Sequence, residues 1–155
     1  VEESLIKIVE NGVFQEIKLN NALEPKGLGT GAAVADIDND GLLELLISHG
    51  ESGLQPLSLF KFNSDEKTSY LRIRPLNMHG APARGATVTL ITNKREHSKT
   101  IDAGSGYLCQ MEPVAHYGIR ENETEFKFKV KWTNGDEDLF DVKNLNETII
   151  VKQSL

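Results

Sequence analysis

The sequence contains one short acidic segment whose residue types and spacing could bind a metal ion: residues 36–44, DIDNDGLLE. Its aspartates alternate with other residues, a glycine follows, and the last residue is again acidic. Side chains at positions 1, 3 and 5 of such a loop converge on a hard cation, position 7 offers its carbonyl, and position 9 completes the shell. We therefore expect Ca²⁺ to be held by oxygen atoms of Asp36, Asp38, Asp40, Leu42 and Glu44.

Two other interpretations of this segment can be weighed from the sequence. An EF-hand needs flanking helices and a glutamate at loop position 12, but that position is Ile47 and the flanking residues have strand character. A solvated turn is the second alternative, because Asp, Asn and Gly favour turns for conformational reasons. Four carboxylates within nine residues would then repel one another with nothing to offset the repulsion, which favours the metal site. Mg²⁺ fits less well because it resists dehydration.

Short β-branched or aromatic runs between Gly, Asn and Asp clusters dominate the chain, and no segment has a sustained helical period. The pattern predicts an all-β fold. Strands are expected at residues 5–9, 14–18, 31–36, 42–48, 57–62, 70–75, 86–91, 126–132, 138–142 and 148–152. The clearest turn is Asn134-Gly135, two residues tolerant of positive φ that would join the strands at 126–132 and 138–142 in a hairpin.

A polar stretch at residues 63–67 divides the chain into two predicted modules. Residues 1–63 have the size and content of one four-stranded propeller-type blade, which would carry the acidic loop. Residues 68–155 have more short strands and turn signals, which predicts a small antiparallel β sandwich or barrel. A single blade cannot bury both of its faces, so we expect it to pack on the second module or on further blades of a parent protein.

Composition excludes several classes of function. The net charge of −6, from 17 basic and 23 acidic residues, argues against a nucleic-acid partner. No apolar run approaches the roughly 20 residues that span a bilayer, so membrane insertion is not expected. The chain begins at Val1 without a basic and then apolar leader, so we expect either that a signal peptide was removed or that this is a fragment of a longer protein. Cys109 and His116 do not suggest a thiol enzyme, because the nearby Glu112 would raise the thiol pKa; Cys109 is expected to be a small buried residue or the partner of a cysteine elsewhere.

The acidic loop between two strands resembles the FG-GAP (VCBS-type) repeat of integrin-like β-propellers, with Glu44 where aspartate is usual. Segments 83–86 (ARGA), 104–109 (GSGYLC) and 111–118 (MEPVAHYG) resemble the ASPIC and UnbV domain of the cartilage acidic protein 1 family. The late hairpin has Trp132-Thr133-Asn134-Gly135 and lacks the proline usual there. The resemblance covers most of residues 20–142. It implies a secreted, glycosylated, non-enzymatic extracellular-matrix protein whose partner is an extracellular protein or receptor, or a matrix glycan.

Two N-glycosylation sequons begin at Asn122 and Asn146, both in predicted turns or strand edges, and Asn122 is the more exposed by sequence. Two alternatives involve glycans. A glycan-cleaving enzyme could use Glu51 and Glu112 as an acid and base pair. A glycan-binding protein could stack sugars on Tyr107, Tyr117 or Trp132, although the alternation of Trp132 with Val130 and Phe128 predicts its burial.

Overall fold

The computed structural model describes residues 6–10, 13–17, 29–50, 57–61, 69–107 and 109–154, and these residues confirm the all-β prediction. No helix that could cross a membrane occurs in this described part of the chain. The strands are β1 (Ile6–Glu10), β2 (Val13–Ile17), β3 (Gly29–Ala35), β4 (Glu44–His49), β5 (Ser58–Lys61), β6 (Ser69–Leu76), β7 (Thr87–Ile91), β8 (Glu96–Thr100), β9 (Ala115–Ile119), β10 (Lys127–Lys131), β11 (Glu137–Asp141) and β12 (Glu147–Lys152).

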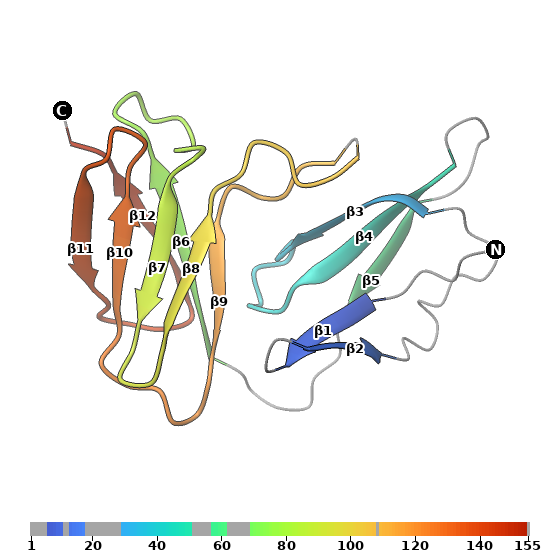
Figure 1. Ribbon diagram of the computed structural model, residues 1–155, viewed down its shortest axis with the longest axis horizontal. Coiled ribbons are helices and arrows are strands. Elements are labelled where there is room, and N and C mark those ends of the chain that lie inside the picture. The colour runs from blue at the N-terminus through green and yellow to red at the C-terminus, as the bar shows by residue number, and fades with distance from the viewer. Residues whose placement is uncertain are drawn as a thin grey trace.

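The later strands form a β sandwich of two facing sheets (Figure 1). One sheet has the order β11-β10-β7-β8 and the other the order β12-β6-β9. Strand alternation places one side chain in two between the sheets, which is why β10 buries Phe128 and Val130 and leaves Lys127 and Lys131 exposed. The core also takes Leu71 from β6, and further buried members are Ile73, Val88, Leu90, Ala115, Tyr117 and Trp132.

The hairpin at Asn134-Gly135 is confirmed, with β10 and β11 paired from Lys131↔Glu137 outward. Only Gly135 has a positive φ, at 96°. Asn134 acts through its side chain instead, since its Oδ1 accepts a hydrogen bond from the Asp136 amide at 3.1 Å. Trp132 is 3% exposed, and its indole nitrogen donates to the Asp138 carboxylate at 2.7 Å, so the predicted burial is confirmed.

The residues before the sandwich form two further sheets. β3, β4 and β5 make an antiparallel three-stranded sheet, and β1 pairs with β2 in a separate hairpin. The region was expected to hold one four-stranded meander; among the described residues it holds three strands in one sheet and two in another. The predicted linker at residues 63–67 lies outside the described residues.

The structure adds two strands that the sequence did not predict, β8 and β9. β8 is a sheet edge whose side chains alternate between exposed and half-buried, and its sequence EHSKT has no apolar member. The second sheet also contains a parallel pair, because β12 runs alongside β6 in the register Ile149↔Ile73. The predicted antiparallel sandwich therefore contains one parallel pair, which joins the first strand of the sandwich to the last.

Candidate metal centre

The acidic loop connects β3 to β4, and its own side chains fix its backbone. The Leu42 amide donates to Asp40 Oδ1 at 2.8 Å, and the Gly41 amide donates to Asp36 Oδ2 at 3.2 Å. Asn39 and Gly41 have positive φ values of 61° and 89°, conformations that Asn and Gly tolerate best. These turns reverse the chain between β3 and β4.

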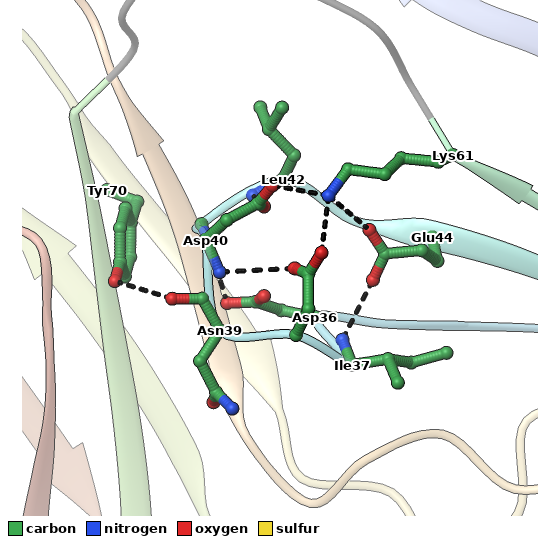
Figure 2. A network of polar contacts seen from close by, with 10 residues as sticks. Asp36, Ile37, Asn39, Asp40, Leu42, Glu44, Lys61 and Tyr70 are labelled. Carbon is green, nitrogen blue, oxygen red and sulfur yellow. Dashed lines mark hydrogen bonds and ion pairs between the residues drawn. The ribbon is translucent and has the colours of Figure 1, made fainter.

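Three predicted ligands converge within this loop (Figure 2). Asp36, Asp38 and Asp40 each offer a carboxylate oxygen, and these oxygens all lie within 4.8 Å of one another. Asp36 is buried, whereas Asp38 and Asp40 are exposed. Glu44, at the start of β4, is 4% exposed, and its Oε2 accepts a hydrogen bond from the Ile37 amide at 2.8 Å.

The donor set fits a calcium ion. Two oxygens on opposite sides of Ca²⁺ lie about 4.6–5.2 Å apart, since each Ca–O distance is about 2.3–2.6 Å. The 4.8 Å spread of the aspartate oxygens agrees with that size. Asp36 Oδ1 and Glu44 Oε1 are buried, and neither has a hydrogen-bond partner among the described residues. Buried carboxylate oxygens without a hydrogen bond are costly, so a cation bound in the loop would stabilise both atoms.

The sequence did not predict the role of Lys61, the last residue of β5. Its ammonium donates to the carboxylates of Asp38 and Asp40, the latter at 2.6 Å, and lies 3.9 Å from Glu44 Oε1. These carboxylates hold the pKa of Lys61 above its usual range, and the hydrogen bond from Lys61 lowers the pKa of Asp40. Glu44 and Lys61 face each other in the register of β4 and β5, which explains how Lys61 reaches the loop.

The sandwich contacts the loop through Arg72 on β6, another residue that the sequence did not single out. Its guanidinium lies 3.2 Å from Asp36 Oδ2 and donates to Asn39 Oδ1 at 2.7 Å and to Glu112 Oε1 at 2.5 Å. Arg72 is 3% exposed although it faces away from the sandwich core, because the loop covers it. Arg74, on the same face of β6, is exposed. One buried arginine therefore links both parts of the chain.

Tyr70, also on β6, packs against the tip of the loop. A methyl group built on Gly41 would lie 2.0 Å from the Tyr70 ring, so the loop can approach this closely only with glycine there. The Tyr70 hydroxyl donates to the Asn39 carbonyl at 3.5 Å (Figure 2), and its ring stacks on His116 with a centroid distance of 5.9 Å. The loop thus packs against a surface formed by Tyr70, Arg72 and His116.

The segment between β8 and β9 extends from the sandwich to β3 (Figure 1). Cys109 donates its thiol to the Ala32 carbonyl at 3.2 Å, and the Val34 amide donates to Met111 Sδ at 3.2 Å. These contacts lie along the edge of β3 that β4 does not cover. The sheet carrying the acidic loop therefore contacts the sandwich at both the loop and this edge.

The two predicted glycosylation sites lie apart from the metal centre. Asn122 is exposed in the turn after β9, and its side chain has no hydrogen-bond partner among the described residues. Asn146 is also exposed, but its Oδ1 accepts a hydrogen bond from the Tyr70 amide at 2.9 Å. Leu42 is half-buried within the loop itself.

The residues proposed for glycan chemistry do not form one site. Glu51 lies outside the described residues, and Glu112 is paired with Arg72. Tyr117 is 1% exposed in the sandwich core with Trp132, so neither ring is available for stacking. Tyr107 is the exposed member of the three. The geometry does not favour either glycan alternative.

Comparison with known proteins gives a family for the chain. The family model described as ASPIC and UnbV matches residues 77–154, which hold most of the sandwich. The chain is also similar to the curated proteins named Cartilage acidic protein 1 from Homo sapiens and Mus musculus, each 48% identical over 124 residues, and from Xenopus tropicalis, 50% identical over 123 residues. These matches cover 79% of the chain but only 19% of each relative's length. The chain belongs to the ASPIC and UnbV family.

Proposed function

We propose that this chain is a calcium-stabilised, non-enzymatic interaction module. One observation carries the proposal: Asp36 Oδ1 and Glu44 Oε1 are buried without a hydrogen-bond partner in the described structure, next to the converging carboxylates of Asp38 and Asp40. Ca²⁺ bound there would neutralise the loop and satisfy both atoms. Because Arg72 and Tyr70 seat the loop on the sandwich, the ion would also stabilise the contact between the two parts of the chain.

The setting we propose is extracellular. The name of the relatives, Cartilage acidic protein 1, supports a protein of the extracellular matrix type. The chain spans about a fifth of the length of those relatives, and the partner that we propose is an extracellular protein or a cell-surface receptor. A Ca²⁺ loop between two antiparallel strands supports an FG-GAP-type repeat, whose neighbouring blades the rest of a longer protein would supply.

Thermal unfolding with and without calcium tests the proposal. Ca²⁺ at about 100 times its Kd stabilises the folded state by about 2.7 kcal/mol, which should raise the melting temperature by about 5–10 °C relative to a chelator. Asp38→Asn removes one carboxylate from the exposed side of the loop and should abolish most of this shift.

The matched control is Asp141→Asn, which removes an exposed carboxylate paired with Lys127 in the sandwich. This variant should keep the full calcium shift. Identical melting curves of the unsubstituted protein in calcium and in chelator would contradict the proposal, as would a shift that Asp38→Asn retains.

Asn122 is the proposed glycan acceptor, since its amide is exposed and the neighbouring turn is held by a pair between Glu123 and Arg95 at 2.5 Å. Protein secreted from a eukaryotic cell should lose mass on treatment with a peptide N-glycosidase. Asn122→Gln should remove most of that change and Asn146→Gln little of it, because the Asn146 side chain already binds the Tyr70 amide. If the glycosidase leaves the mass of the secreted protein unchanged, neither asparagine carries a glycan.

A further inference from the structure

The ammonium of Lys61 contacts carboxylates that a cation bound by the acidic loop would also use (Figure 2). Its nitrogen is hydrogen-bonded to Asp38 and Asp40 and lies 3.9 Å from Glu44 Oε1. All three carboxylates belong to the proposed calcium ligands. Lys61 is thus a cation that the exposed side of the loop already holds, while Arg72 contacts its buried side through Asp36.

Lysine and calcium cannot use these oxygens together. An ammonium is a compact charge with directed donors, whereas Ca²⁺ takes six to eight oxygens at about 2.3–2.6 Å. Two cations sharing the same carboxylates would lie a few ångströms apart and repel strongly. The side chain of Lys61 is 42% exposed at the end of a strand, and its four-carbon stem is flexible. It can therefore leave for solvent without movement of β5.

Lys61 forms hydrogen bonds with only some of the carboxylate oxygens of the loop. It bonds the exposed carboxylates of Asp38 and Asp40, while Asp36 Oδ1 and Glu44 Oε1 keep no hydrogen-bond partner among the described residues. A permanent replacement for the metal would be expected to form hydrogen bonds with the buried oxygens first, because a buried oxygen without a hydrogen bond costs most. The pattern is that of an exchangeable cation.

We propose that Lys61 is an internal counter-cation that occupies the acidic loop in the absence of calcium and is displaced when calcium binds. This inference rests on the proposed calcium-binding function. The exchange has two consequences. Part of the loop's negative charge remains neutralised without metal, and calcium binds more weakly than it would to the same loop without the lysine, because displacement of Lys61 is part of binding.

Calcium calorimetry on Lys61→Met tests the exchange. Methionine keeps an apolar stem of similar length and removes the charge. Its calcium affinity should exceed that of the unsubstituted protein by between about threefold and tenfold, the size expected for loss of an exposed pair of charge contacts. Its melting temperature should be lower in chelator and unchanged in saturating calcium. Lys61→Gln provides a second neutral variant, and Lys61→Arg should retain the unsubstituted affinity.

The matched control is Lys127→Met, which removes a lysine of similar exposure whose ion pair with Asp141 lies in the sandwich. It should leave calcium affinity unchanged. Equal or weaker affinity in both neutral Lys61 variants, with normal binding by the unsubstituted protein, would overturn the inference and leave the proposed function intact. Binding only in the neutral variants would uphold it. No binding in any of these proteins would overturn the calcium function itself.

Discussion

Gly41→Ala should destabilise the protein by about 2–5 kcal/mol, from backbone strain and overpacking together. Gly41 has a φ of 89°, and its new methyl group would lie 2.0 Å from the Tyr70 ring. The ring is fixed by stacking on His116, so it cannot move aside without breaking that contact. The loop would have to lift from the sandwich, and calcium affinity should fall with stability. Urea unfolding and calcium calorimetry measure the two effects.

The control for Gly41→Ala is Gly80→Ala, at a similar φ of 85° but with no atom within 4 Å of the new methyl group. Gly80→Ala introduces backbone strain without a steric clash, so it should lower the free energy of unfolding by about 1–2 kcal/mol. A second check combines Gly41→Ala with Tyr70→Ser, which removes the ring, so that the excess cost of the alanine should largely disappear. Equal losses at Gly41 and Gly80 would show that the loop does not pack on Tyr70.

Arg72→Met should cost about 3–5 kcal/mol, the range for breaking a buried ion pair from one side. The substitution leaves Asp36 buried without its guanidinium partner and leaves Asn39 and Glu112 each without a donor. Ca²⁺ bound in the loop would neutralise Asp36 again, so the loss should be larger in chelator than in calcium. Urea unfolding under both conditions gives the comparison.

Arg74→Met is the matched control, because Arg74 lies two residues away on the same face of β6 but is exposed. Its effect should stay within about 0.5 kcal/mol. Arg72→Lys keeps the charge and loses the forked donors, so it should fall between the two methionine variants. If Arg72→Met and Arg74→Met behave alike, the loop is not held on the sandwich by Arg72.

Local patterns in the sequence predicted the features that depend on neighbours in the chain. The acidic loop follows from the alternation of Asp36, Asp38 and Asp40, and the all-β class follows from period-2 runs such as Phe128, Val130 and Trp132. The hairpin before β11 follows from Asn134-Gly135. β8 was not predicted because it is an edge strand of polar residues, so its sequence shows no alternation of apolar and polar side chains.

The features that depend on contacts between distant segments could not be predicted in this way. Alternation along β6 places Tyr70, Arg72 and Arg74 on one outward face and gives no reason to distinguish them. Arg72 is buried because the acidic loop packs over it, whereas Arg74 lies beyond the loop and is exposed. Lys61 joins the loop because β5 pairs with β4 in the register that sets it beside Glu44, and no local pattern fixes that register.

Calorimetric titration of the protein with Ca²⁺ tests the central claim most directly, with Asp38→Asn titrated in parallel. The account predicts one bound ion per chain in the unsubstituted protein and loss of most of the binding in the variant, because the three aspartate oxygens lie within one coordination shell. Absence of binding heat, or the same binding in Asp38→Asn, would contradict it.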